Sequence, residues 1–182
     1  ASHVRSVRRF VDAAGSEVKV AAVAGFPLGA MQVDAKAYEV QTALEDGAHE
    51  IDLVMNIGQA KAGNWAYVED EIYAIGQMCR EDGAILKVII ETCLLSDDEI
   101  ARACKAAKNA GADYVKTSTG FSTGGAKAED VALMKKTAGG ELLVKASGGI
   151  RSLEDAKAMI AAGADRLGCS ASIDIIEAYE ND

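Results

Sequence analysis

Apolar residues recur along this chain with two alternating periods. Six short runs rich in Val, Ile and Leu are typical of strands, and the longer segments between them have the spacing of amphipathic helices. The predicted strands are residues 18–26, 50–57, 85–92, 114–118, 142–147 and 166–170. The predicted helices are residues 34–46, 65–82, 96–110, 128–137 and 152–162, with one more before the first strand and one after the last.

Helix-boundary signals agree with these ranges. Ser96 and Ser152 each stand three residues before an acidic residue, as in a capping box. Gly47, Gly111 and Gly163 follow predicted helices, where glycine commonly ends them. Strict alternation of strand and helix predicts a parallel sheet with helices outside, either a barrel or a doubly wound sheet. No Gly-x-Gly-x-x-Gly motif follows the first strand, which disfavours a dinucleotide-binding sheet.

Alternation within the strands places charged side chains on one face. Ile51, Leu53 and Met55 share the face that packs under helices. The residues directed to a common interior on the other face are Asp52, Lys87, Lys116 and Lys145. An unpaired ammonium costs several kcal/mol to bury, or its pKa falls until it is neutral and nucleophilic. The pattern favours a catalytic centre over an ion-pair network that only fills the barrel, and it leaves all three lysines open as the nucleophile.

Three of the predicted strands end in glycine-rich loops. Lys116 precedes Gly120, Lys145 precedes Gly148 and Gly149, and the last strand ends in a third loop. Backbone N–H groups in such loops can bind phosphate. A lysine beside them indicates imine chemistry on a phosphorylated carbonyl compound.

Composition narrows the class of protein. The 182 residues, 49% of them apolar with one proline, predict a single domain spanning 1–182. A net charge of -9 disfavours a nucleic-acid surface, and no apolar run is long enough for a membrane span. Four cysteines without metal-binding spacing predict a cytoplasmic protein. With only His3 and His49 available, we expect neither a metal nor a Ser-His triad, and no cofactor.

Four longer motifs resemble those of the deoxyribose-phosphate aldolase family. They are residues 50–58, 86–92, 115–121 and 144–151, and the resemblance covers nearly the whole chain. It implies an α/β fold of the TIM (β/α)8 barrel type, with six of the eight strands in this sequence. It also implies a class I aldolase, a lyase of deoxyribonucleotide catabolism. That enzyme reversibly cleaves 2-deoxy-D-ribose 5-phosphate to D-glyceraldehyde 3-phosphate and acetaldehyde.

The resemblance implies a role for each interior residue. Lys116 would form the Schiff base, and Lys145 would be the neighbouring cation that favours its free amine. Asp52 would serve in the proton relay. We expect Lys87 to form a supporting ion pair with Asp52. The residues expected to bind phosphate are Gly120, Gly148, Gly149, Arg151, Gly168 and Ser170.

Some features depart from the family pattern. The family has a strand, a helix and a second strand, roughly 30 to 40 residues, before the stretch that matches the first residues here. Omitted residues, a truncation, or a partner chain that completes the sheet would each account for this. An N-terminally incomplete barrel has unpaired edge strands, which predicts a homo-oligomer. Ala171 and Phe121 stand where relatives have a serine and a lysine, which weakens the expected phosphate site.

Two other functions remain as alternatives. An inactive, truncated barrel could serve as an oligomerisation or phosphometabolite-binding module, and a reducible imine on Lys116 distinguishes the aldolase from it. A phosphosugar isomerase ranks last, because the strand ends lack a glutamate and histidine pair suited to enolisation. The expected partner is a small phosphosugar, with no nucleic acid and no membrane.

Overall fold

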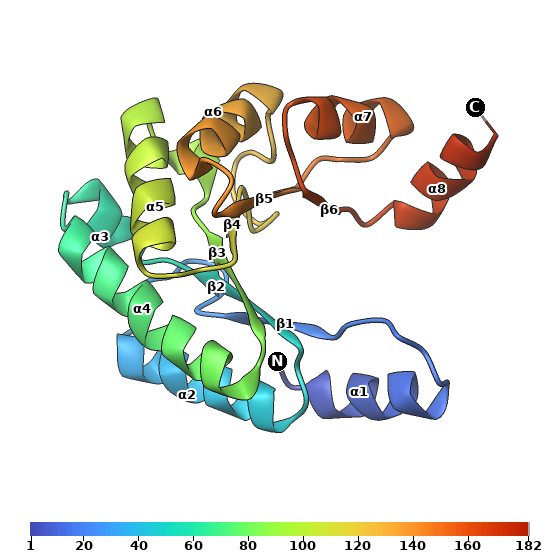
Figure 1. The fold of residues 1–182 in the computed structure, drawn as a ribbon, viewed down its shortest axis with the longest axis horizontal. Helices are drawn as coiled ribbons and strands as arrows, with labels where there is room; N and C mark the ends of the chain where they lie inside the picture. Colours follow the sequence, from blue (N-terminus) through green and yellow to red (C-terminus); the bar gives the residue numbers. More distant parts are fainter. Residues whose placement is uncertain (182) are drawn as a thin grey trace.

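Six parallel strands form one curled sheet in the order β1-β2-β3-β4-β5-β6 (Figure 1). The structure is a computed structural model and describes residues 1–181. The strands are β1 (Ala21–Ala24), β2 (Glu50–Val54), β3 (Ile85–Ile89), β4 (Tyr114–Lys116), β5 (Leu143–Ser147) and β6 (Arg166–Gly168). Their sequential order and curvature are those of a barrel, not of a doubly wound sheet, so the predicted fold class is confirmed.

Helices that connect the strands cover the outer face of the sheet, and two further helices stand at the ends of the chain (Figure 1). They are α1 (Val4–Ala13), α2 (Val33–Glu45), α3 (Ile57–Lys61), α4 (Trp65–Asp82), the 3-10 helix η1 (Thr92–Leu94), α5 (Asp97–Asn109), α6 (Ala128–Ala138), α7 (Leu153–Ala161) and α8 (Ser172–Glu180). Each of the five helices predicted by range ends within one residue of its observed bounds, and the two flanking helices are present. Both capping boxes form, at Ser96 and Ser152.

The strands are shorter than the sequence predicts. The predicted strand 50–57 ends at Val54, and Asn56 instead accepts a hydrogen bond from the Gln59 N–H, 3.1 Å away, as the cap of α3. The predicted strand 85–92 ends at Ile89, and η1 begins where that strand was expected to finish. The apolar runs extend past the strands because Met55 and its neighbours remain buried after leaving the sheet. An apolar run therefore indicates buried residues, and these continue past the end of the strand.

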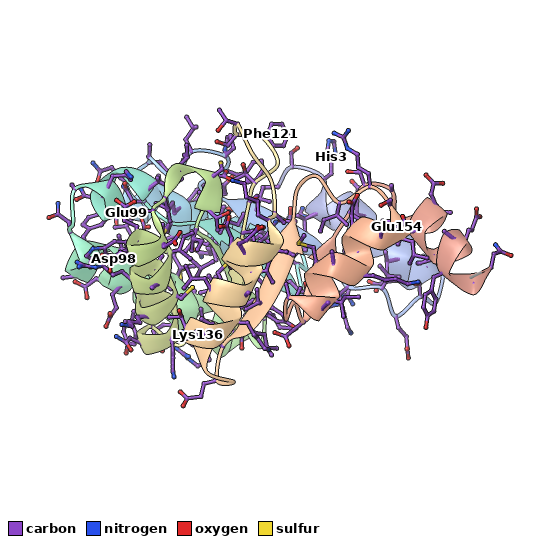
Figure 2. The ribbon with its side chains drawn as sticks, turned by 90° about the horizontal axis from the view of Figure 1, so that it is seen from above. His3, Asp98, Glu99, Phe121, Lys136 and Glu154 are labelled. Atoms are coloured by element: carbon purple, nitrogen blue, oxygen red, sulfur yellow. The ribbon has the colours of Figure 1, made fainter. Side chains whose placement is uncertain are left out.

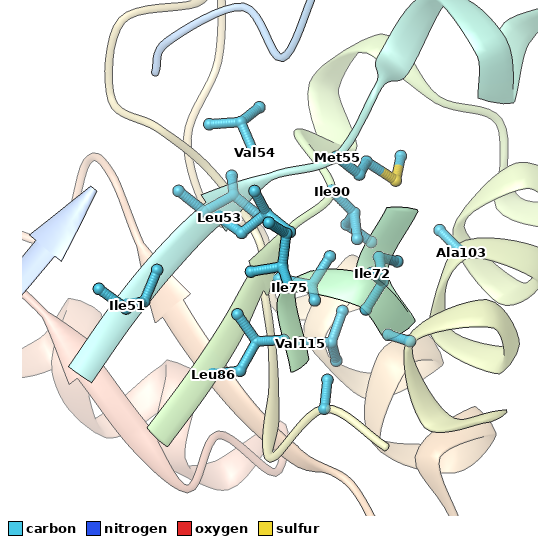
Figure 3. Close-up of a cluster of buried hydrophobic side chains, with 14 of the residues drawn as sticks. Ile51, Leu53, Val54, Met55, Ile72, Ile75, Leu86, Ile90, Ala103 and Val115 are labelled. Atoms are coloured by element: carbon cyan, nitrogen blue, oxygen red, sulfur yellow. The ribbon is translucent and has the colours of Figure 1, made fainter. Parts of the chain in front are cut away.

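The hydrophobic core lies between the sheet and its helices (Figure 3). Ile51, Leu53 and Met55 are fully buried there, and Val54, which alternation places on the opposite face with Asp52, is fully buried as well. Ile72 and Ile75 of α4 belong to the same buried cluster. The strands are therefore anchored from outside, which leaves their inner faces to carry polar groups.

Two strands lie at the ends of the described sheet, β1 and β6. The curl does not bring them together, so residues 1–181 form a half-barrel with an open side (Figure 1). Within this described part of the chain, no helix combines the length and the apolar character needed to cross a bilayer.

Candidate active site

Asp52 of β2 is the centre of the interior charge cluster. Its Oδ1 accepts a hydrogen bond from Lys87 at 2.5 Å, while its Oδ2 accepts from Lys116 at 2.7 Å and from Lys145 at 2.9 Å. The four side chains come from adjacent strands, because Asp52 is the register partner of Lys87 and Lys116 that of Lys145. The predicted convergence of charge, and the predicted ion pair between Lys87 and Asp52, are both present.

Burial and charge act in opposite directions on these groups. Burial alone raises the pKa of Asp52, but the ammonium groups of Lys116, Lys87 and Lys145 outweigh it and hold that pKa well below its usual range. Asp52 is therefore a carboxylate at neutral pH. Burial lowers the pKa of Lys145, and Lys116 and Lys87 lower it further against the opposing effect of Asp52. Lys145 therefore releases its proton more readily than an exposed lysine.

A cavity of about 810 Å³ lies beside the two lysines of β4 and β5. All six residues expected to bind phosphate line it, together with both lysines. The full lining is Lys116, Thr119, Gly120, Phe121, Lys145, Ser147, Gly148, Gly149, Ile150, Arg151, Gly168, Cys169, Ser170 and Ala171. Asp52, only 3% exposed, lies behind the two lysines. Three loops that are far apart in the sequence thus form one wall around a pair of amines.

The loops after β4 and β5 are held against each other by backbone contacts. The Ala126 N–H donates to the Gly148 carbonyl at 2.9 Å. A Cβ placed on Gly125 would lie 2.3 Å from that same carbonyl oxygen, so only glycine fits there. The Ser147 hydroxyl donates to the Ser118 carbonyl at 2.8 Å. This packing fixes the cavity wall relative to the strands that carry the lysines.

Residues 1–176 match the model of the DeoC/LacD family aldolases. The chain belongs to this family. The deoxyribose-phosphate aldolase of Thermococcus gammatolerans is 51% identical over 178 residues, which cover 98% of this chain and 79% of the relative. The enzyme of that name from Clostridium perfringens is 55% identical over 168 residues, which cover 92% of this chain and 75% of the relative.

A comparison with solved structures also supports membership of this family. The deoxyribose phosphate aldolase of Aeropyrum pernix, described as a tetramer, superposes with a TM-score of 0.90 at 35% identity. The match covers 98% of this chain and 74% of that one. The half-barrel of this DeoC/LacD family member is therefore the same arrangement of strands as in its relatives.

A second pair of charged residues in this family member was not singled out by the sequence. Glu50 lies 2.8 Å from Lys87 through Oε2, and its two carboxylate oxygens accept from Arg166 at 2.9 and 2.8 Å. The Arg166 guanidinium also lies 5.0 Å from the centroid of the Tyr114 ring. Strand alternation could have identified Glu50, because it stands two residues before Asp52 and its side chain therefore lies on the same face.

Glu91 is the other missed residue. Its backbone is left-handed, with φ 56°, and its side chain is 1% exposed. The carboxylate accepts from the Thr119 hydroxyl in a short hydrogen bond and from the Thr119 N–H at 3.3 Å. Thr119 lines the cavity, so Glu91 fixes one of the wall residues. Glu91 stands four residues after Lys87, so strand alternation places both on the interior face, but it gives no sign of the contact with Thr119.

The loop after β1 reaches the cavity wall. The rings of Phe26 and Phe121 meet edge to face, with centroids 5.3 Å apart. Figure 2 shows Phe121 at one edge of the molecule and Lys136 at the opposite edge.

Among residues 1–181, no group of three or more potential metal ligands is found. The charged groups at the site are amines and a carboxylate.

Proposed function

We propose that this chain is a class I aldolase that reversibly cleaves 2-deoxy-D-ribose 5-phosphate through a Schiff base on Lys116. The products are D-glyceraldehyde 3-phosphate and acetaldehyde. One observation carries the proposal: Lys116 and Lys145 share Oδ2 of Asp52 at the wall of a cavity built from glycine-rich loops. The two relatives named deoxyribose-phosphate aldolase support the choice of substrate.

The charges in the interior favour a free amine. Four cationic side chains of the cluster share only two carboxylates, those of Asp52 and Glu50. An excess of positive charge in a buried site favours loss of a proton from one lysine. Burial lowers the pKa of Lys145, and the ammonium groups of Lys116 and Lys87 lower it further, so Lys145 can give up its proton in this site. The family resemblance favours Lys116 over Lys145 as the nucleophile.

The reaction then follows from imine chemistry. The Lys116 amine adds to the C1 aldehyde carbon, and the carbinolamine loses water to give a protonated imine. Loss of the C3 hydroxyl proton breaks the C2–C3 bond, and the electron pair moves to the imine nitrogen to give an enamine and the phosphorylated aldehyde. The enamine takes a proton at C2, and water releases acetaldehyde. Asp52 and Lys145 are the groups available to move these protons.

Phosphate binding is assigned to the glycine-rich loops of the cavity wall. Backbone N–H groups of Gly120, Gly148, Gly149 and Gly168 are available there, with Ser170 and the Arg151 guanidinium. Oriented backbone donors and a guanidinium are the groups that proteins use for phosphate.

Cleavage assays test this proposal. Wild-type protein should release acetaldehyde from 2-deoxy-D-ribose 5-phosphate, with a much higher KM for unphosphorylated 2-deoxy-D-ribose. Lys116→Met should abolish cleavage, and Lys127→Met should not, because Lys127 is exposed and outside the cavity lining. A folded wild-type protein that releases no aldehyde, or a fully active Lys116→Met variant, would contradict the assignment.

We further propose that residues 1–182 form one aldolase barrel domain that works as a cytoplasmic homo-oligomer. The tetrameric relative from Aeropyrum pernix supports self-association. Four free cysteines support a reducing compartment. Light scattering that gives the mass of a single chain would contradict the oligomer.

A further inference from the structure

Beneath the carboxylate of Asp52 lies an ion pair that crosses the interior of the half-barrel. Arg166 comes from β6 and Glu50 from β2, with three strands between them in the sheet. Both oxygens of Glu50 accept from one guanidinium nitrogen, at 2.9 and 2.8 Å. The pair therefore ties the last described strand directly to the strand that carries Asp52, without passing through the strands between them.

Lys87 connects this ion pair to the proposed catalytic carboxylate. Its side chain is fully buried, with Nζ 2.8 Å from Glu50 and 2.5 Å from Oδ1 of Asp52. A buried ammonium holds its partners tightly, because losing one leaves a charge without compensation. With Oδ1 held by Lys87, Oδ2 remains for the two lysines that line the cavity.

We infer that Glu50 and Arg166 are positioning residues that set the orientation of the Asp52 carboxylate. Arg166 holds Glu50, and Glu50 in turn holds Lys87. Lys87 then fixes the rotation of Asp52, which directs Oδ2 toward the cavity lysines. This inference rests on the proposed aldolase reaction. Neither Glu50 nor Arg166 lines the cavity, so both act on the reaction through Lys87 and not on the substrate.

The chain of contacts predicts graded effects on turnover. Glu50→Gln removes the charge that holds Lys87, and a small misplacement of a catalytic group lowers the rate by about 10- to 100-fold. Arg166→Met leaves the contact between Glu50 and Lys87 in place, so its effect on kcat should be smaller. Arg166→Lys keeps a cation next to Glu50 and should recover most of the loss. KM should stay within about twofold in all three, because the cavity wall is unchanged.

The test measures kcat and KM for 2-deoxy-D-ribose 5-phosphate, with melting temperatures, in the wild type and the three variants. The matched control is Lys135→Met, which breaks the Lys135–Asp165 ion pair next to Arg166 but outside the barrel. We expect kcat to fall most in Glu50→Gln, less in Arg166→Met and least in Arg166→Lys. KM should stay unchanged in these variants, and both constants should stay unchanged in the control. If Glu50→Gln does not fold, the partial loss in Arg166→Met and its recovery in Arg166→Lys decide the question.

Two results overturn the inference, and they have different meanings. An active wild type together with folded Glu50 and Arg166 variants of unchanged kcat shows that the ion pair is structural only. A folded wild type that cleaves nothing overturns the proposed function, and the inference with it.

Discussion

Lys116 and Lys145 are register partners in β4 and β5, and their ammonium groups bond to the same oxygen of Asp52. The other oxygen of that carboxylate accepts a hydrogen bond from Lys87. The shared oxygen gives the two amines a direct route for proton exchange. Burial, and after it the nearby Lys116 ammonium, lowers the pKa of Lys145.

Removing Lys145 should therefore slow the chemistry while substrate still binds. Lys145→Met takes away the group that exchanges a proton with Lys116, and loss of such a group lowers kcat by about 10² to 10⁴-fold. Single-turnover cleavage of 2-deoxy-D-ribose 5-phosphate measures this. Lys136→Met, on the far edge of the molecule, is the control. A Lys145→Met protein at the wild-type rate would contradict the role.

Asp52 should govern acid stability. A carboxyl whose pKa is lowered on folding binds fewer protons in the folded state, so its contribution is present above the unfolded pKa and is lost as the pH falls toward the folded value. The free energy of unfolding should therefore drop steeply below about pH 4 in the wild type and less steeply in Asp52→Asn. Denaturant titrations between about pH 2 and pH 7 measure both slopes. Equal acid slopes would count against the lowered pKa.

A buried ion pair outside the barrel interior fixes the end of β2. Lys36 donates to Glu71 at 2.8 Å and to the Val54 carbonyl at 2.9 Å, and Glu71 accepts from the Asn56 N–H at 2.9 Å. Both side chains are almost fully buried. Glu71→Gln leaves the ammonium without its counter-charge and should lower the free energy of unfolding by about 3–5 kcal/mol.

Chemical denaturation of Glu71→Gln tests that cost against an exposed pair. Asp98→Asn removes the partner of Arg102 on the solvent face of α5, and it should change stability far less. The double variant Lys36→Met with Glu71→Leu should regain much of the loss, because no uncompensated charge remains. Similar losses in Glu71→Gln and Asp98→Asn would show that burial of the pair has little weight.

Gly125→Ala should damage the cavity wall. The new Cβ would lie 2.3 Å from the Gly148 carbonyl oxygen, so the two loops must separate. We expect a loss of about 1–3 kcal/mol in stability and a higher KM for the phosphorylated substrate. Gly140→Ala is the control, since its φ of 89° adds backbone strain but no atom lies within 4 Å of the new Cβ. An unchanged KM in Gly125→Ala would show that the contact between Gly125 and Gly148 does not affect substrate binding.

The sequence predicts the strands, the helices and the inward-facing lysines because these depend on local periodicity. The helices repeat with capping signals at their ends, and the strands place Asp52 and the lysines on one face. Adjacent parallel strands then bring these side chains together. The half-barrel needs no further information to assemble this part of the site.

Other contacts depend on the curl of the sheet, which alternation does not encode. Glu50 and Arg166 are 116 residues apart and meet only because the sheet bends β6 toward β2. Glu91 binds Thr119 because its backbone turns out of the strand into a left-handed conformation. Nothing in the local sequence predicts that turn. The hydrophobic pattern therefore predicts neither the contacts across the interior nor the backbone conformation at the end of a strand.

Borohydride reduction in the presence of 2-deoxy-D-ribose 5-phosphate, followed by intact mass and peptide mapping, tests whether Lys116 forms an imine with the substrate. The reduced adduct should be on the peptide that contains Lys116, and it should be absent from the Lys116→Met variant. An adduct on Lys145 instead would reverse the roles of the two lysines. No adduct on folded wild-type protein would contradict imine catalysis at this site.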